Sequence, residues 1–301
     1  PNLQCIYGPY TSIDKNYFYS DMVNTDELIL KYFEPYHLDV AGNFVITDII
    51  IGKTLSSSYE RNDELDAIIM DYRDRPVLLV TGYWPPTNEM LRHFSQKPEI
   101  NPDGWMGEDW NNLGFDVVSY FPEFNPPDCT DCGQGYGDLE VDYQDTSGDF
   151  WSIVDDEKPF GIITFSRGFN NYSWEIENNL RNRNNWYADY TTPFFPTPTP
   201  PDDSVEDNYN RNNALPMDEI VVAIENSGLA VDPYIDENGG AGMFLSEFMG
   251  YHGMWYHHIN TDTEFPCLTG GHIHVGGQVS TRLAQDAAEV TIATVLDYLS
   301  Q

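Results

Sequence analysis

Residues 75–81 read Arg-Pro-Val-Leu-Leu-Val-Thr, and residues 159–165 read Pro-Phe-Gly-Ile-Ile-Thr-Phe. Both runs are almost continuously apolar, which is typical of strands that are buried on both faces of a parallel sheet. Further short apolar runs alternate along the chain with segments of helical periodicity. This alternation predicts an α/β fold with a mostly parallel central sheet and helices on both faces, in three α/β/α layers.

The elements expected around these two strands follow the same alternation. They are a strand over residues 113–121, a helix after Ser173, a helix over 217–227, a strand near 229–235, a helix after Gly242, a strand around His272 and a closing helix over 281–299. Ligands of such sheets bind beyond the carboxyl ends of the strands. We therefore expect Thr81, Ser166 and the glycine-rich loop at residue 239 to lie on one rim of the sheet.

The first quarter of the chain has residue patterns that differ from those of the rest. It contains an acidic helical pattern over residues 25–33, a strand-like run over 43–51, and a second helical pattern over 62–72 that begins with capping residues. We expect residues 1–75 to form an N-terminal extension packed on a hydrolase-type catalytic domain of residues 76–301. Because the sequence begins with Pro1, we also expect a leader to have been removed or to lie outside it.

The balance of acidic and basic residues limits the classes of binding partner. The chain has 49 acidic residues against 14 basic ones, for a formal net charge of −35 at pH 7. Such a surface argues against binding to nucleic acids or anionic membranes, and the lack of an 18-residue apolar run argues against membrane insertion. It suits a hydrated protein in a salty or extracellular medium, where ions screen self-repulsion. Attraction of cationic substrates or Ca²⁺ remains an alternative interpretation.

The four cysteines are Cys5, Cys129, Cys132 and Cys267. An even number of cysteines in an acidic chain with few lysines favours a secreted protein with up to two disulfides. The sequence does not choose among the three pairings. The Cys-Thr-Asp-Cys motif over 129–132 could instead be half of a zinc site or a redox pair, although no second such motif accompanies it.

Two long loops interrupt the alternation. The first runs from residue 124 to 149, and its seven acidic residues from Asp128 onward could ligate a structural Ca²⁺ or simply remain solvated. The second, over residues 191–213, begins with a proline-rich stretch that is stiff and extended. It could be a lid or substrate wall, or an ordinary surface excursion.

The candidate chemistry combines Ser246, at the start of an apolar helical segment, with His274, in the run Gly-His-Ile-His-Val over residues 271–275. A serine hydroxyl attacks an acyl carbon only when a neighbouring base removes its proton. His274 could be that base, and a carboxylate such as Glu177 could orient its imidazole. Gly239 and Gly240 would allow a tight turn before the helix, whose first amides could face a developing oxyanion.

Two alternative sites compete with this assignment. Ser166 follows an apolar strand as a nucleophile elbow does, although Thr164 replaces the usual first glycine. Five of the seven histidines, His252, His257, His258, His272 and His274, lie within 23 residues and could form a metal centre. The zinc-peptidase motif His-Glu-x-x-His is absent from the sequence. We expect no required cofactor.

Six short motifs, taken in order, resemble the pyroglutamyl peptidase type I family of cysteine peptidases. They are Thr81-Gly82-Tyr83, Asn101-Pro102, Arg167, Glu177 with Asn182, Gly242-Met-Phe244-Leu-Ser246 and Ile273-His274-Val275. The resemblance spans about residues 76–301. It implies that Glu177 and His274 are catalytic, that Tyr83 and Trp84 form the pocket floor, and that Ser166 and Arg167 lie in the pocket wall. Ser246 stands where the family has its nucleophilic cysteine.

These features together predict a secreted, salt-adapted, serine-type hydrolase of an amide or ester bond, with a peptide or small-molecule substrate. A Ser-His-Glu triad of Ser246, His274 and Glu177 would carry the reaction. Two alternatives stay open. The chain could be a catalytically silent relative that binds a ligand, or a metal-dependent hydrolase that uses the histidines of residues 252–274.

Overall fold

The computed structural model describes residues 36–38, 44–46, 75–129 and 133–300, and the chain divides into two compact units, residues 1–74 and 75–301. In the first unit, strands β1 (Tyr36–Leu38) and β2 (Phe44–Ile46) pair antiparallel. β2 falls within the strand expected over residues 43–51. The helices expected over 25–33 and 62–72 lie outside the described residues.

The second unit is built around a six-stranded sheet with the strand order β11-β8-β12-β7-β3-β4. Its strands are β3 (Val77–Tyr83), β4 (Asp116–Tyr120), β7 (Gly161–Gly168), β8 (Ser173–Glu177), β11 (Asp232–Asp236) and β12 (Thr269–Gly276). Neighbouring strands are parallel except at the β12–β8 pair, which is antiparallel. The mostly parallel sheet expected from the apolar runs is therefore confirmed.

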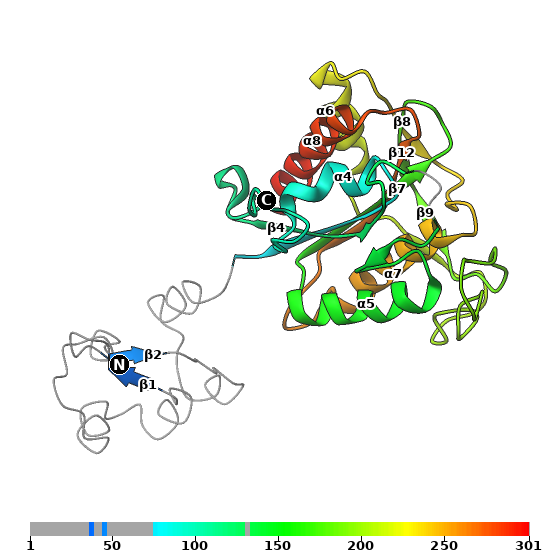
Figure 1. Cartoon of the computed structure of the whole chain (residues 1–301), viewed down its shortest axis with the longest axis horizontal. Coiled ribbons are helices and arrows are strands. Elements are labelled where there is room, and N and C mark those ends of the chain that lie inside the picture. The colour runs from blue at the N-terminus through cyan, green and yellow to red at the C-terminus, as the bar shows by residue number, and fades with distance from the viewer. Residues whose placement is uncertain (1–35, 39–43, 47–74, 130–132, 301) are drawn as a thin grey trace. The chain divides into compact units, whose positions relative to one another are not determined.

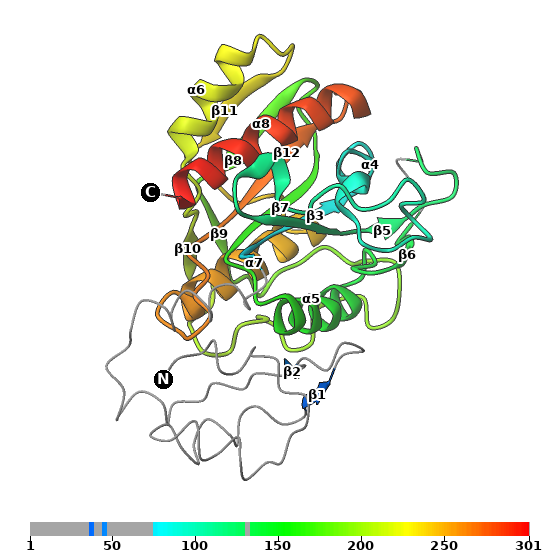
Figure 2. The same cartoon turned by 90° about the vertical axis from the view of Figure 1, so that its left-hand side faces the viewer.

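Helices cover both faces of this sheet (Figures 1 and 2). On one face lie α4 (Thr87–Leu91), α6 (Met217–Ser227) and α8 (Thr281–Leu299), and on the other lie α5 (Tyr143–Glu157) and α7 (Leu245–Asn260). The smaller elements are η3 (Arg92–Phe94), η4 (Trp110–Asn112) and two antiparallel pairs, β5 (Pro122–Glu123) with β6 (Tyr136–Gly137) and β9 (Asn179–Arg181) with β10 (Asn210–Asn212). The three-layer α/β/α prediction is confirmed.

The helix expected after Ser173 is wrong, because this segment is strand β8. Trp174 and Ile176 are fully buried in the core on the α8 side of the sheet. Alternate residues of a strand face opposite sides of the sheet, so Glu175 and Glu177 point to the α7 side. The apolar and acidic residues alternate with a period of two, which is the pattern of a half-buried strand.

The first acidic loop is shorter than expected, because helix α5 begins at Tyr143. The carboxylate of Asp142 caps this helix by accepting hydrogen bonds from the backbone N–H groups of Gln144 and Asp145. Asp149 accepts a hydrogen bond from the backbone of Leu139. These carboxylates stabilise the local chain, and calcium binding by the loop stays a prediction.

Cys267 is a free, fully buried thiol. It donates a hydrogen bond to the carbonyl of Thr269 at 3.3 Å, and burial raises the pKa of the thiol to about 12. An arrangement of two disulfides within the chain is therefore wrong. Cys5 and Cys132 lie outside the described residues, so the pairing of Cys129 stays a prediction. No described helix is long and apolar enough to span a bilayer.

Candidate active site

The alternation of side chains along β12 positions the first candidate residue. Ile273 and Val275 are fully buried in the core beneath α8, while His272 and His274 point to the opposite face, which α7 covers. His274 lies directly across the antiparallel pair from Glu175 of β8. The sheet thus brings an imidazole and two carboxylates together, although 97 residues separate His274 from Glu177 in sequence.

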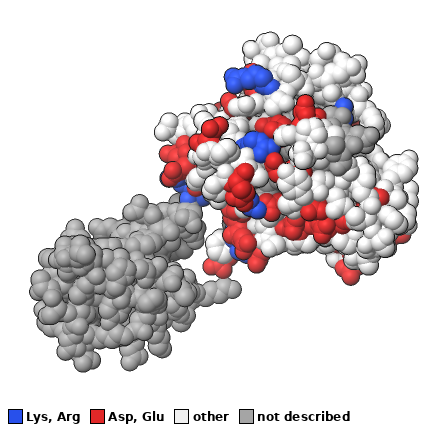
Figure 3. Space-filling model, in the orientation of Figure 1, with Lys and Arg blue, Asp and Glu red and all other residues white. Residues whose placement is uncertain are grey.

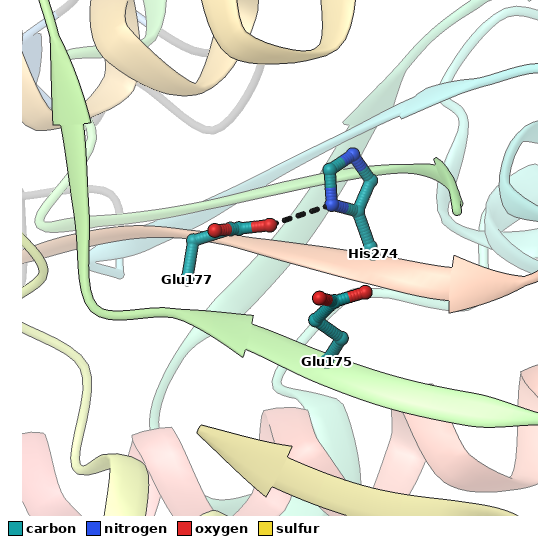
Figure 4. A group of neighbouring side chains, drawn as sticks. All are labelled: Glu175, Glu177 and His274. Atoms are coloured by element: carbon teal, nitrogen blue, oxygen red, sulfur yellow. Dashed lines mark hydrogen bonds and ion pairs between the residues drawn. The ribbon is translucent and has the colours of Figure 1, made fainter. Parts of the chain in front are cut away.

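Glu177 and His274 form a buried pair. The Nδ1 atom of His274 lies 2.7 Å from Oε1 of Glu177, and the two residues are 8 % and 2 % exposed (Figure 4). An ionised carboxylate can only accept hydrogen bonds, so Nδ1 carries the proton and donates a hydrogen bond to Glu177. The lone pair of a neutral His274 is then on Nε2, where it could accept a proton.

Ser246 is the second residue of α7. No side chain caps the start of this helix. Instead, the fully buried Glu247 accepts a hydrogen bond from the backbone N–H of Met243 at 2.8 Å and forms a 2.7 Å ion pair with Arg183. These contacts hold the loop before the helix against its first turn, where N–H groups have no carbonyl partner within the helix. Ser246 is therefore presented at the positive end of the helix dipole.

Ser246, His274 and Glu177 all line one cavity of about 1100 Å³. Its wall also includes Trp84, Arg167, Phe169, Asn170, Glu175, Tyr187, Asp236, Gly240, Phe244 and Gln278. Within the described residues, the hydroxyl of Ser246 makes no hydrogen bond to His274. Catalytic hydrogen bonds are often longer in unliganded enzymes and shorten when substrate binds. The three predicted catalytic residues thus share a cavity, but only two of them are hydrogen bonded.

The predicted substrate-binding residues divide into two groups. Trp84, Arg167 and Gly240 line the cavity, and Trp84 stacks on Phe244 with ring centroids 6.0 Å apart. The side chains of Tyr83 and Ser166 lie beneath the cavity and outside its wall, because they are 1 % and 0 % exposed. Burial there raises the pKa of Tyr83, whose hydroxyl is hydrogen bonded to Thr146.

Gly239 also lies outside the cavity wall, and its role is structural. Its φ of +59° favours glycine, and a Cβ atom at this position would lie 2.2 Å from the carbonyl oxygen of Asn179. Gly239 therefore allows the loop after β11 to pass close to β9. The neighbouring Gly240, with a φ of +91°, continues this loop along the cavity.

Ser166 is hydrogen bonded to a histidine, but this pair cannot meet a substrate. Its hydroxyl lies 3.0 Å from Nε2 of His272, whose Nδ1 lies 2.8 Å from the hydroxyl of Thr164. All three side chains are 0 % exposed. Burial holds the pKa of His272 well below its usual value, so the ring is neutral. This arrangement does not support Ser166 as an exposed nucleophile.

The five clustered histidines do not converge on a common point. His252 is buried on α7 and bonds to the carbonyl of Phe248, while His257 bonds to the carbonyl of Cys267. His272 is held by the two hydroxyl groups described above, and His258 is exposed. Among the described residues, the one group of at least three side chains with suitable ligand atoms close together is Glu175, Glu177 and His274. The five described histidines therefore do not form the metal centre that was considered as an alternative.

Several cavity residues were missed by the sequence interpretation. Glu175 could have been found, because its alternation with Glu177 places both carboxylates on one face of a strand. Phe244 lies within the Gly-x-Phe-x-Ser segment and could also have been assigned to the cavity. Asp236 and Gln278 carry no comparable local signal, because only the assembled sheet brings the ends of β11 and β12 to one rim.

The loop that begins with the proline-rich stretch was interpreted either as a lid or substrate wall or as a surface excursion. Tyr187 and Ala188, just before it, line the cavity, but residues 191–201 do not. The segment after it is anchored by a buried ion pair between Arg211 and Asp202. Tyr251 of α7 joins this pair through 3.0 Å hydrogen bonds to both partners. These contacts favour the interpretation of residues 191–201 as a surface excursion.

Comparisons with known proteins support the fold assignment. No protein-family model matches the chain, and no curated protein matches it. Among solved structures, pyroglutamyl peptidase I from Bacillus amyloliquefaciens has a TM-score of 0.51 at 16 % identity, covering 74 % of this chain and 98 % of that one. Pyrrolidone carboxyl peptidase from Thermococcus litoralis has a TM-score of 0.53 at 17 % identity, covering 75 % and 95 %. A mutant of the Pyrococcus furiosus enzyme has a TM-score of 0.52 at 16 % identity, covering 74 % and 99 %.

These structures align along almost their whole length with about three quarters of this chain. At such low identity the likeness establishes the fold and leaves the chemistry to be argued from the residues. The fold expected from the six ordered motifs is thus confirmed: the chain has the α/β/α fold of the pyroglutamyl peptidases.

Proposed function

We propose that this chain is a serine-type, peptidase-like hydrolase of an amide or ester bond. The observation that carries the proposal is the buried Glu177–His274 hydrogen bond of 2.7 Å at a cavity that Ser246 also lines. The shared fold with pyroglutamyl peptidases supports a hydrolase. The motif resemblance supports the further inference that Ser246 replaces the nucleophilic cysteine of that family.

In the proposed mechanism, Oγ of Ser246 attacks the acyl carbon of the substrate and its proton passes to Nε2 of His274. Glu177 keeps the proton on Nδ1 and stabilises the imidazolium that forms. The N–H groups in the first turn of α7 stabilise the negative charge that develops on the acyl oxygen. The imidazolium then protonates the leaving group, and water hydrolyses the acyl-enzyme through the same base.

The cavity favours a substrate with an apolar or ring-shaped group. Trp84 and Phe244 form a stacked pair at its wall, and the exposed ring of Phe169 lies at the same cavity. Aromatic faces bind apolar groups and rings without requiring a particular charge. We therefore propose a peptide or a small molecule with such a group as the substrate. The acidic composition supports a secreted protein of a salty medium.

The proposal is tested by labelling the full chain with a fluorophosphonate probe and mapping the adduct by peptide mass spectrometry. We expect the adduct on Ser246, none in Ser246→Ala, and a labelling rate lowered by about 10²-fold or more in His274→Ala, because the general base is lost. His258→Ala is the matched control, since His258 is exposed on α7 away from the cavity. It should label at the wild-type rate.

Two results would contradict the proposed mechanism. An adduct on Ser246 that forms equally fast in His274→Ala would show that this serine is not activated by the imidazole. No adduct on the folded wild-type chain would favour the catalytically silent, ligand-binding alternative. That alternative is supported by the missing hydrogen bond between Ser246 and His274 in the described structure.

A further inference from the structure

Glu175, which plays no part in the proposed triad, belongs to a compact group of metal-ligating side chains. One oxygen of Glu175, one oxygen of Glu177 and one imidazole nitrogen of His274 all lie within 4.8 Å of one another. The three side chains point to the same side of the sheet from β8 and β12 (Figure 4). Their backbone is held by the antiparallel pairing of His274 with Glu175.

One carboxylate oxygen of these three side chains lacks the partner that a buried polar atom normally has. Oε2 of Glu177 is buried and accepts no hydrogen bond from any residue that the structure describes, and Glu177 is only 2 % exposed. Leaving a buried carboxylate oxygen unpaired is unfavourable, because its hydration has been lost without replacement. A cation bound to this carboxylate would supply the missing interaction.

A second set of side chains supports Glu175. Asn170 donates a 2.5 Å hydrogen bond to the hydroxyl of Tyr234, which in turn is hydrogen bonded to the carboxylate of Glu175. Hydrogen bonds of this kind orient the carboxylate ligands of protein-bound metals.

The charges around the group also favour a cation. Glu175, Glu177 and Asp236 line the cavity, and Arg167 is the one Lys or Arg among the described residues of its wall. Two carboxylates that lie close together in a buried position repel each other. A divalent cation between them would remove this repulsion and would remain reachable through the open cavity.

We propose that Glu175, Glu177 and His274 bind a first-row divalent transition metal, with Zn²⁺ as the test ion. Two carboxylate oxygens and one imidazole nitrogen match the ligands that bind Zn²⁺, whereas Ca²⁺ and Mg²⁺ prefer oxygen ligands alone. Three protein ligands leave a fourth position for water or a ligand from the cavity. This binding site does not depend on the proposed hydrolase activity.

Metal binding would also oppose the proposed catalysis. If Zn²⁺ were bound through Nδ1 of His274, the nitrogen that faces Glu177, the neutral ring would have to hold its proton on Nε2 instead. Nε2, which accepts the proton of Ser246 in the proposed mechanism, would then already carry a proton. The hydrolase, if active, should be inhibited by Zn²⁺ and restored by a chelator, which distinguishes this site from a catalytic metal centre.

The test is isothermal titration of the chelator-treated full chain with ZnCl₂ at neutral pH. We expect a saturable site in the wild-type chain that is weakened about tenfold or more in Glu175→Gln, since even the loss of a residue supporting a metal ligand costs about 10-fold to 100-fold in affinity. Asp236→Asn removes a different acid of the same cavity and should bind as the wild type does. Ser246→Ala should also retain the site.

A second readout uses Co²⁺, whose visible absorption reports its coordination. We expect the absorption of bound Co²⁺ to change markedly in Glu175→Gln and to be unchanged in Asp236→Asn. The inference is overturned if the folded wild-type chain has no saturable site, or if Glu175→Gln binds Zn²⁺ as tightly as the wild type. If Zn²⁺ binds as expected and the probe labels no serine, the site stands and the proposed hydrolase fails.

Discussion

The imidazole of His252 is fully buried on α7 among aromatic rings, including those of Phe150, Phe248 and Trp255. Its Nδ1 atom lies 2.8 Å from the carbonyl oxygen of Phe248, and its Nε2 lies 3.3 Å from the hydroxyl of Ser147. Burial lowers the pKa of this histidine to about 4. The density of histidines suggested a metal ligand, but this one is a neutral core residue.

This shift predicts that His252 makes the fold sensitive to acid. Between pH 6.5 and pH 4 the unfolded chain binds a proton that the folded chain excludes. The neutral His252 therefore makes its full contribution to the free energy of unfolding above pH 6.5. This contribution is lost as the pH falls towards 4. We expect the decrease in the free energy of unfolding between pH 7 and pH 4.5 to be about 2 kcal/mol smaller in His252→Phe than in the wild type.

Urea unfolding of both chains at the two pH values measures this difference. All other titrating groups are shared, so their contributions cancel in the comparison. Phenylalanine has a similar shape and suits the aromatic surroundings, which keeps the variant folded. An equal loss of stability in both chains would contradict the low pKa of His252.

Residue patterns and the motif resemblance selected the three residues of the proposed triad. They chose Glu177, His274 and Ser246, which the fold brings to one cavity. They did not reveal that Tyr83 and Ser166 are buried beneath it. A residue at the carboxyl end of a strand can face the rim or the core, and the neighbouring strands and the overlying helix decide which.

At the scale of elements, α7 approaches the sheet closely because it carries glycine at the contact. A Cβ atom added to Gly250 would lie 2.4 Å from Cδ1 of Leu180 and 2.8 Å from Cγ of His272. Both neighbours are 0 % exposed and have little room to move. The glycine therefore sets the distance between the helix that carries Ser246 and the strand that carries His274.

We expect Gly250→Ala to lower the free energy of unfolding by about 1–3 kcal/mol, because overpacking outweighs the gain in helix propensity of about 1 kcal/mol. Gly148→Ala in α5 is the matched control. No atom lies within 4 Å of a Cβ atom built there, so only the propensity gain applies and the chain should become more stable. Urea unfolding measures both, and a stabilised Gly250→Ala would show that α7 can move away from the sheet.

The elements with a strong, uninterrupted period were predicted well. The closing helix expected over 281–299 is α8 (Thr281–Leu299), and the helix expected over 217–227 is α6 (Met217–Ser227). Strand β8 was mistaken for a helix although its five residues alternate with the period of a half-buried strand. That error concealed the pairing of Glu175 with His274, which depends on an antiparallel neighbour.

At the scale of the whole molecule, acidic side chains are more widespread than Lys and Arg on the face of the described residues that Figure 3 shows. The formal charge of −35 implies strong self-repulsion in the folded chain at low ionic strength. The Debye length falls from about 30 Å at 0.01 M salt to several ångströms near 0.5 M. Added salt should therefore stabilise the compact state.

We expect the Tm to rise by several degrees between 10 mM and 500 mM NaCl, since a gain of about 1 kcal/mol raises the Tm of a chain this large by about 2 °C or more. Differential scanning calorimetry measures the change. Choline chloride at the same ionic strength is the control, because a screening effect does not depend on the kind of cation. A Tm that stays constant or falls would contradict adaptation to salt.

The sequence by itself determined the α/β alternation, the acidic character and the three residues proposed for catalysis. These follow from local periodicity, from composition and from ordered motifs, all of which are written along the chain. The tertiary structure alone decided which strand pairs antiparallel, which side chains lie beneath the cavity, and that Glu175 joins Glu177 and His274. Contacts between segments about 100 residues apart depend on strand order and on how closely helix and sheet pack, and no local pattern encodes either.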